Sequence, residues 1–229
     1  MGRRVVLGLC LLGAAGVLSG RRLQDTVNDV LTPVQIRDPT GLISLLPLGN
    51  TFRYYSVTTA IPDIAPADFR LDVGGLVRRP RRYGLADLER LPQVSLTRDF
   101  QCVTGWRVPD VPWRGVRLAT LLDAAGPRAG ATAVRFRSSD GAYTESLTLE
   151  QARRSDVLVA TEMLGAPVTR HHGGPVRLYV APMYGYKSIK WLSGIEVTGD
   201  VVAGYWERRG YDIDAWVGAS NGRRDAPTT

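Results

Sequence analysis

Cys102 is the residue of this sequence best suited to chemistry, because it is the one thiol in the body of the chain. The other cysteine, Cys10, lies in an apolar N-terminal stretch, so Cys102 has no evident partner for an intramolecular disulfide. A lone thiolate can ligate a metal or attack an electrophile. Its surroundings, Gln101-Cys102-Val103-Thr104-Gly105-Trp106, contain neither a Gly-Ser-Cys elbow nor an adjacent base.

Three uses of Cys102 stay open at this level. In a cysteine hydrolase, Cys102 would attack the substrate with His171 or His172 as the base. In a non-catalytic secreted binding domain, Cys102 would simply be a buried side chain. In a metalloenzyme it would be a ligand, although one thiol and two adjacent histidines cannot form an ordinary tetrahedral zinc site.

A second candidate site lies in the segment Tyr184-Gly185-Tyr186-Lys187-Ser188-Ile189-Lys190-Trp191. Both lysines of the chain fall within it, and Arg177 precedes it closely. Two ammonium groups, a serine hydroxyl and a guanidinium predict a phosphate cradle. The alternative is a solvated loop that carries two lysines by chance.

The elements that must position these residues are short. Alternating or continuous apolar patterns predict strands at 69–73, 134–137, 176–180 and 195–197, helices at 85–91 and 118–125, and an extended segment at 51–60. Thr148 and Gln151 form a capping box that opens a further helix. Strands and helices do not alternate regularly, and no Gly-x-Gly-x-x-Gly or Walker sequence occurs. The expected fold class is therefore a β-rich α+β domain.

The N-terminus has the pattern of a targeting segment. Arg3 and Arg4 precede the sixteen uncharged residues 5–20, which are fewer than the roughly 20 that a membrane-spanning helix needs. Paired arginines indicate a twin-arginine signal, which exports folded proteins, and the segment could persist as an anchor. A buried core helix is the alternative. We expect a signal or anchor at 1–22, a linker at 23–50, a catalytic domain at 51–200 and a C-terminal extension at 201–229.

The net charge of +7 comes from 29 lysines and arginines against 22 acidic residues. The arginines are scattered apart from a cluster at Arg78, Arg79, Arg81 and Arg82. A basic balance can indicate nucleic acid, a membrane surface or an anionic ligand. No basic helix and no basic–aromatic interleaving occur, so we expect no nucleic-acid partner.

Taken together, the motifs resemble the molybdopterin-binding domain of the sulfite-oxidase-type enzymes. The matching stretches, in order, are 54–60, 101–106, 111–116, 174–178 and 184–192. The Cys-Val-x-x-Trp form at Cys102 is most similar to that of the molybdenum subunits of bacterial periplasmic methionine sulfoxide reductases. The resemblance implies the sulfite-oxidase-type molybdopterin-binding fold, with mixed sheets and short helices.

The resemblance also implies a cofactor and its ligands. A single pterin dithiolene would hold molybdenum (Mo-MPT), with the Cys102 thiolate as the protein ligand, and a soft thiolate suits such a metal. By the same match, the cofactor contacts would come from Tyr55, Ser56, Ser138, His172, Arg177, Ser188, Ile189 and Lys190, with Ile189 acting through its backbone. His172 stands where the reductase has an asparagine, and Ser138 stands where the family often has a threonine.

The activity implied by the resemblance is two-electron oxygen-atom transfer at molybdenum. We expect reduction of a sulfoxide such as protein methionine sulfoxide, with sulfite oxidation as the alternative. The sequence has no haem-attachment motif and no cysteines for an iron–sulfur cluster, so an external electron partner is expected, such as a membrane haem protein. The place of action would be the periplasm or the outer face of the cytoplasmic membrane. Trp106, Arg107, Asp110 and Tyr186 are expected to line the substrate mouth.

Overall fold

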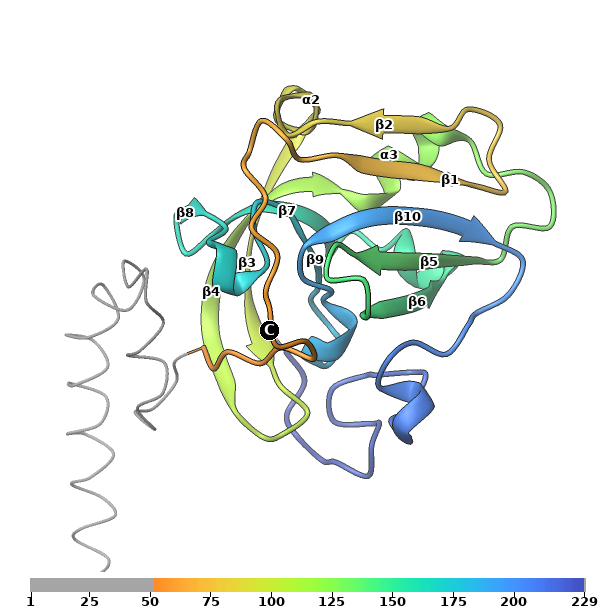
Figure 1. Cartoon of the computed structure of the whole chain (residues 1–229). Helices are drawn as coiled ribbons and strands as arrows, with labels where there is room; N and C mark the ends of the chain where they lie inside the picture. Colours follow the sequence, from red (N-terminus) through yellow and green to blue (C-terminus); the bar gives the residue numbers. More distant parts are fainter. Residues whose placement is uncertain (1–51, 229) are drawn as a thin grey trace, which may run out of the picture. The chain divides into compact units, whose positions relative to one another are not determined.

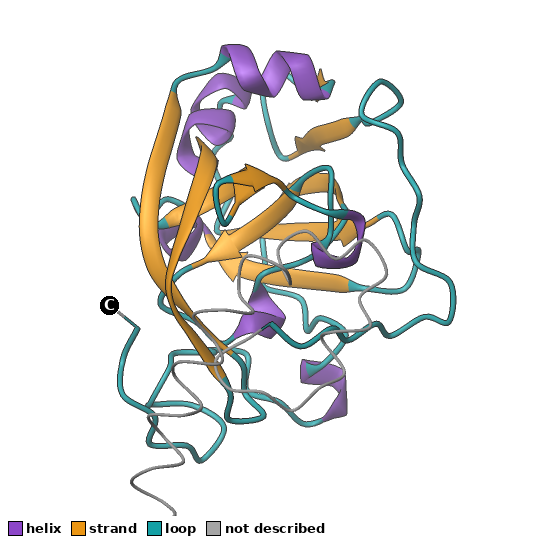
Figure 2. Cartoon of the chain, turned by 90° about the vertical axis from the view of Figure 1, so that its left-hand side faces the viewer, coloured by secondary structure: helices purple, strands orange, loops and turns teal. Residues whose placement is uncertain are grey.

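The computed structural model of the chain describes residues 52–228 (Figures 1 and 2). The predicted signal at 1–22 and the predicted linker at 23–50 lie outside the described residues. Within the described part, no helix is long and apolar enough to cross a membrane.

One sheet of the domain is mixed. Its strands, in spatial order, are β2 (Arg81–Tyr83), β1 (Leu71–Gly75), β10 (Leu192–Thr198), β5 (Ala133–Ser138) and β6 (Thr144–Thr148). β1 and β10 run parallel, with Val73 opposite Ile195, and the other pairs are antiparallel. A parallel pair needs a long crossover, so β1 and β10 come from the two ends of the domain.

The other sheet is antiparallel. It contains β3 (Gln93–Gln101), β4 (Arg107–Arg117), β7 (Val157–Met163) and β8 (Ala166–Pro167), and β9 (Arg177–Val180) also pairs with β7. β3 and β4 form a long hairpin whose ladder shifts register between Arg98 and Phe100. The chain turns at the end of this hairpin, between Gln101 and Arg107, and Cys102 lies in that turn.

The helices are short and have identifiable ends. They are α2 (Leu85–Arg90), α3 (Leu118–Ala125), α4 (Leu149–Ala152) and the 3₁₀ turns η2 (Arg170–His172), η3 (Gly185–Lys187) and η4 (Glu207–Arg209). The capping box of α4 is formed, since Thr148 Oγ1 accepts from Gln151 N at 3.1 Å and Gln151 Oε1 accepts from Thr148 N at 2.9 Å. α3 ends at Gly126, which has a φ of 68°.

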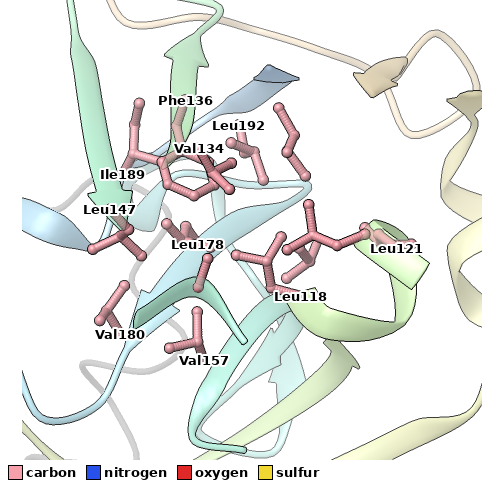
Figure 3. Packing of buried hydrophobic residues seen from close by; sticks show 14 of the residues in the cluster. Leu118, Leu121, Val134, Phe136, Leu147, Val157, Leu178, Val180, Ile189 and Leu192 are labelled. Carbon is pink, nitrogen blue, oxygen red and sulfur yellow. The ribbon is translucent and has the colours of Figure 1, made fainter. Parts of the chain in front are cut away.

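The core fills the space between the two sheets and α3 (Figure 3). Its labelled members are Leu118 and Leu121 of α3, Val134 and Phe136 of β5, Leu147 of β6, Val157 of β7, Leu178 and Val180 of β9, Ile189, and Leu192 of β10. Each of these side chains is at most 1% exposed. Ala215 and Val217 join the same cluster, so residues of the expected C-terminal extension pack into the domain.

The predicted fold class is confirmed, and so are both predicted helices, the helix at the capping box and the four predicted strands, each within a few residues. No strand forms over residues 52–60, where the chain is irregular. The β3–β4 hairpin was not predicted. Most residues that face outward from the hairpin are polar or proline, and β4 contains two prolines. Prolines are unusual inside a strand, and they weaken the alternation of apolar and polar residues that would predict one.

Candidate functional site

The turn that holds Cys102 closes the β3–β4 hairpin tightly. Cys102 N donates to Trp106 O at 2.9 Å, and Gly105 N donates to Cys102 O at 3.0 Å. The Cys102 side chain is half-buried, and its Sγ lies 3.2 Å from Thr104 Oγ1. The backbone on both sides of the thiol is therefore fixed while the sulfur stays accessible.

Trp106 links this turn to the N-terminal loop through stacked rings. Its ring centroid lies 5.6 Å from that of Phe100 and 6.5 Å from that of Tyr55, with interplanar angles of 24° and 30°. Trp106 is buried, whereas Tyr55 is 53% exposed. The stack therefore runs from the interior to the surface beside Cys102.

Phe100 also contacts the lysine-bearing segment. A Cβ at Gly185 would come within 2.4 Å of Phe100 Cζ, so η3 approaches the ring as closely as it does because this residue is glycine. Phe100 thus lies between the cysteine turn and the segment 184–191, although these two parts of the chain are far apart in sequence.

Arg177 is a buried cation that is bonded to neutral groups. Its guanidinium donates to the carbonyl oxygens of His172 at 2.8 Å, Ser188 at 3.0 Å and Leu178 at 3.4 Å. It also lies over the rings of Phe100 and Trp113, 5.5 and 5.4 Å from their centroids. Burial lowers the pKa of Arg177 to about 10. A charge in such a position is stabilised by an anionic partner.

Lys190 is a second cation of the same kind. Its Nζ donates to Tyr55 O and lies 4.4 and 4.6 Å from the ring centroids of Tyr54 and Trp191. Burial and then the charge of Arg177 lower the pKa of Lys190 to about 7, and Asp140 opposes this shift in part. Lys190 and Arg177 therefore create a positive region that favours an anion.

His172 is neutral near pH 7. Burial, and then the charges of Arg177, Lys190 and His171, lower its pKa to about 3. Its neighbour His171 meets the ring of Tyr54 edge-on, with centroids 5.4 Å apart. A general base is most effective when its pKa is near the working pH, so His172 is poorly suited to activate Cys102 as a nucleophile.

The hydroxyl groups predicted to contact a cofactor accept hydrogen bonds from backbone N–H groups. Ser188 Oγ accepts from Val180 N at 3.0 Å, Ser138 Oγ accepts from Asp140 N at 3.2 Å, and Ser56 Oγ accepts from Thr58 N at 3.2 Å. Ile189 O accepts from Leu178 N at 2.9 Å. Ser138 is opposite Leu192 in the β5–β10 ladder, two residues beyond Lys190.

The prediction that Lys187 belongs to the phosphate cradle is wrong. Its Nζ donates to Glu145 Oε2 at 3.0 Å, to Ser146 O at 3.1 Å and to Glu207, and the side chain is 1% exposed. The 3₁₀ turn η3 directs Lys187 into the interior, and Lys190 lies three residues further along the chain, outside that turn. Spacing along the sequence could not distinguish the two lysines.

The residues predicted at the substrate mouth have different surroundings. Arg107 donates to Asp99 Oδ2 at 3.0 Å, to Gln101 Oε1 at 2.6 Å and to the carbonyls of Ala226 and Pro227. Asp110 is exposed, at a φ of 50°. Tyr186 is 8% exposed, and its hydroxyl donates to Asp212 O at 2.7 Å. Of the four, Trp106 lies directly in the cysteine turn.

The donor set at Cys102 restricts how a metal could bind there. In the part of the chain that the structure describes, no group of three or more histidine, cysteine, aspartate or glutamate side chains could hold a metal ion. A metal on Cys102 would therefore need its other donors from a bound cofactor or solvent. A thiolate beside a cationic, carbonyl-lined region fits a metal carried by an anionic organic group.

Several residues that shape this region belong to no motif that is recognisable in the sequence. Phe100 and Gly185 bring the two motifs together, and Arg223 of the C-terminal segment lies against the cysteine turn, 3.0 Å from a Cβ placed at Gly105. The Arg223 guanidinium pairs with Asp225, whose Oδ2 accepts from Tyr184 at 2.8 Å. No local pattern could reveal these contacts, because the partners lie far apart in sequence.

Comparison with known proteins gives a family match. Residues 58–206 match the family model described as oxidoreductase molybdopterin binding domain. Among curated relatives, an uncharacterized oxidoreductase, YuiH, of Bacillus subtilis is 34% identical over 172 residues, which cover 70% of this chain and 86% of that protein. The protein-methionine-sulfoxide reductase catalytic subunit MsrP of Gluconobacter oxydans is 30% identical over 251 residues, covering 98% of this chain and 78% of that protein.

More distant similarities extend to longer proteins. Sulfite oxidase of Arabidopsis thaliana is 30% identical over 179 residues, which cover 63% of this chain and 46% of that protein. The crystal structure of the sulfane dehydrogenase SoxCD from Paracoccus pantotrophus has a TM-score of 0.58 at 22% identity, covering 63% of this chain and 41% of that chain. This likeness supports the fold, and the chain spans less than half of either protein.

Proposed function

Because the chain belongs to the oxidoreductase molybdopterin-binding domain family, we propose that it is an exported enzyme that reduces a sulfoxide such as protein methionine sulfoxide. Family membership makes the chain a molybdopterin-dependent oxidoreductase. The direction of the reaction, the substrate and the cellular location are the parts that we propose. The family match covers most of the proposed catalytic domain, residues 51–200.

The observation that carries the proposal is the pair of cations beside Cys102. Arg177 bonds to carbonyl groups, and Lys190 bonds to a carbonyl and two aromatic rings. Both pKa values are lowered, so this region favours an anion. The phosphate of a pterin cofactor would supply such a charge. Phe100 connects this region to the cysteine turn, because its ring stacks on Trp106 and lies under Arg177.

Each residue has a role in this proposal. Cys102 would hold molybdenum through its thiolate throughout turnover, without attacking the substrate. Lys190, Arg177, Ser188 and the Ile189 backbone would hold the phosphate end, and Tyr55, Ser56, Ser138 and His172 would contact the pterin. When bound, the cofactor supplies the two-electron redox chemistry of molybdenum.

A neutral substrate is favoured by the charges at the cysteine turn. Arg107 pairs with the buried Asp99, and Arg223 pairs with Asp225. Sulfite is a small dianion and requires converging arginines that are free to bind it, whereas a sulfoxide is neutral. Reduction of a sulfoxide consumes two electrons and two protons and releases water. Sulfite oxidation is the competing activity.

The electrons would come from an external partner. The sequence holds no haem-attachment motif and no cysteine set for an iron–sulfur cluster. We infer a membrane haem protein as the donor, and a site of action in the periplasm or on the outer face of the cytoplasmic membrane. The twin-arginine pattern at Arg3 and Arg4 supports export of the folded, cofactor-loaded chain.

Metal analysis tests the proposal directly. Protein produced in a host that makes the cofactor should contain molybdenum in equimolar amount, and Cys102→Ser should lose the metal's thiolate spectrum and the activity. Cys10→Ser is the matched control and should retain both. Protein without molybdenum, or a Cys102→Ser variant with unchanged turnover, would contradict the proposal.

Substrate choice is tested on the loaded enzyme in both directions. Reduced viologen with methionine sulfoxide measures reduction, and an artificial electron acceptor with sulfite measures oxidation. We expect the reduction to be the faster reaction by kcat/KM. Metal-independent hydrolysis that is blocked by a thiol reagent would instead support the cysteine hydrolase, although the low pKa of His172 argues against that residue as its base.

A further inference from the structure

The arginine cluster noted in the sequence has no role in the site described above. Arg78, Arg79 and Arg81 lie in and after the loop that joins β1 to β2, and Arg128 lies in the loop that joins α3 to β5. All four are exposed. We call residues 76–81 and 126–130 the basic loop pair.

The two loops are held side by side by backbone contacts. Val77 and Pro127 form an isolated β-bridge, Arg78 N donates to Gly126 O at 2.9 Å, and Arg128 N donates to Leu76 O at 2.9 Å. Figure 1 shows both loops on the right-hand side, at the edge of the domain toward which β10 points. The arginines therefore form one patch although they come from segments about 50 residues apart.

Two guanidinium groups of this patch, those of Arg78 and Arg79, are close together. Arg78 Nε and Arg79 Nη2 both lie within 4 Å of the point where a Cβ at Gly126 would be. Arg79 Nε donates to Ala124 O at 3.2 Å, and Arg128 Nε donates to Val77 O at 2.8 Å. These bonds to neutral carbonyls fix the side chains and leave their charges uncompensated.

Most carboxylates near the patch already form ion pairs with other arginines. Asp72 pairs with Arg82, and Asp123 pairs with Arg153. Asp200, which follows β10, forms no ion pair within the described residues. Four arginines against one free carboxylate leave a local surplus of three positive charges. These charges repel one another, and an anionic surface in contact with the patch would reduce that repulsion.

An apolar side chain lies within the patch. Leu76 is 40% exposed, and its backbone is bonded to Arg128 and to Val197 of β10. A surface that combines several arginines with an exposed leucine matches the interface of an anionic bilayer, where the charges meet phosphate groups and the leucine enters the acyl boundary.

We propose that the basic loop pair docks the domain on an anionic phospholipid surface. The patch lies at the C-terminal end of β10, whereas Lys190 and Ser138 lie at its other end, about 20 Å away at the usual rise of a strand. Docking through this end leaves the region around Lys190 and Ser138 directed away from the lipid.

Vesicle binding by the full chain tests this proposal. The probes are vesicles of phosphatidylcholine alone and vesicles of equal parts phosphatidylcholine and phosphatidylglycerol. The apolar N-terminal segment of the sequence can bind both kinds, so the difference between them reports the charge contribution.

Each basic residue near an anionic leaflet strengthens binding about fivefold. Replacing Arg78, Arg79, Arg81 and Arg128 by glutamine should weaken binding to the anionic vesicles at least about tenfold, and added salt should weaken wild-type binding in the same way.

The matched control removes the same number of positive charges elsewhere. Glutamine at Arg90, Arg114, Arg154 and Arg170 removes arginines that already pair with carboxylates. This variant should bind the anionic vesicles nearly as well as the wild type. Equal losses in both variants would show that net charge alone matters and would overturn the proposal.

Further measurements separate membrane binding from loss of the fold and from nucleic-acid binding. Arg78→Gln/Arg81→Gln alters two side chains that form no hydrogen bond in the described structure, so the fold should be unaffected while anionic binding still falls severalfold. Sulfoxide turnover in solution should be unchanged in all patch variants. Binding to duplex DNA of equal phosphate concentration, with none to the anionic vesicles, would assign the patch to nucleic acid and overturn the membrane proposal.

Discussion

Lys187 and Glu145 form a fully buried ion pair, with Lys187 Nζ 3.0 Å from Glu145 Oε2 and both side chains at most 1% exposed. Glu207 of η4 accepts a second hydrogen bond from the same ammonium group, and its side chain is buried as well. One lysine and two carboxyl groups are neutral together when one carboxyl is protonated. Burial raises the pKa of Glu145 well above its ordinary value, and the neighbouring Glu207 adds to this effect, although Lys187 opposes it. Glu145 therefore binds a proton more readily in the folded domain than in the unfolded chain.

Lys187→Met should destabilise the domain by about 3–5 kcal/mol, because it leaves two buried carboxyl groups without their cation. Urea unfolding with a constant slope measures the loss. The double variant Lys187→Met/Glu207→Gln should recover part of it, because an amide replaces the charged partner. A loss below about 1 kcal/mol for the single variant would show that the cluster is hydrated rather than buried.

Glu145→Gln should change the pH dependence of stability. The folded state holds a proton on Glu145 that the unfolded chain releases above pH 4.5, so the free energy of unfolding falls as the pH rises towards the raised pKa of Glu145. This fall, at most about 1.4 kcal/mol per pH unit, should be absent from Glu145→Gln. Glu89→Gln, on the exposed face of α2, is the control and should keep the wild-type profile.

Lys190 should produce a pH effect of the opposite sign in protein without cofactor. Its folded pKa is about 7 against 10.5 in the unfolded chain, so between these values the unfolded chain holds the extra proton. The free energy of unfolding should therefore rise with pH in that window, by up to about 1.4 kcal/mol per unit, and Lys190→Met should lack this rise.

The same residue gives a readout of anion binding. Inorganic phosphate should raise the pKa of Lys190 and stabilise the wild type more than Lys190→Met, because a ligand that binds the folded state stabilises it by mass action. Chemical unfolding at several phosphate concentrations measures the effect. Equal stabilisation of both proteins would remove Lys190 from the proposed phosphate site.

Gly185→Ala should disturb the contact between the cysteine turn and the lysine-bearing segment. The new Cβ would lie 2.4 Å from Phe100 Cζ, and relieving such an overlap in a packed core costs about 1–3 kcal/mol. We also expect weaker retention of the cofactor, because Phe100 stacks on Trp106 and lies under Arg177. Gly74→Ala, where no atom lies within 4 Å of the new Cβ, is the matched control and should retain normal stability and cofactor.

Arg223→Gln should loosen the Cys102 turn from the C-terminal side. The substitution removes the guanidinium that lies against Gly105 and its two bonds to Asp225. Global stability should change little, because ion pairs that are partly open to solvent contribute little. In a Cys10→Ser background without cofactor, the Cys102 thiol should react severalfold faster with a thiol reagent. The exposed neighbour Arg224→Gln should leave that rate unchanged.

The sequence by itself determined the local elements and the chemical types. The 118–125 helix, the capping box of Thr148 and Gln151, and the strands around Val73, Phe136, Leu178 and Ile195 follow from apolar spacing and turn residues, which act over a few positions. The lone thiol at Cys102 and the lysine-bearing segment are also visible in one dimension. Their order along the chain indicated the family that the comparison confirmed.

The tertiary structure decided which charges are free. Lys187 and Lys190 are equivalent in sequence, yet Lys187 meets Glu145 and Glu207, whereas Lys190 meets a carbonyl and two rings. Arg107 looked available for a substrate, but Asp99 and the C-terminal carbonyls engage it. Whether a charge is available depends on partners up to 120 residues away. Such partners meet only when the sheets pack, because hydrogen bonds and ion pairs are set by distance in space and not by spacing along the chain.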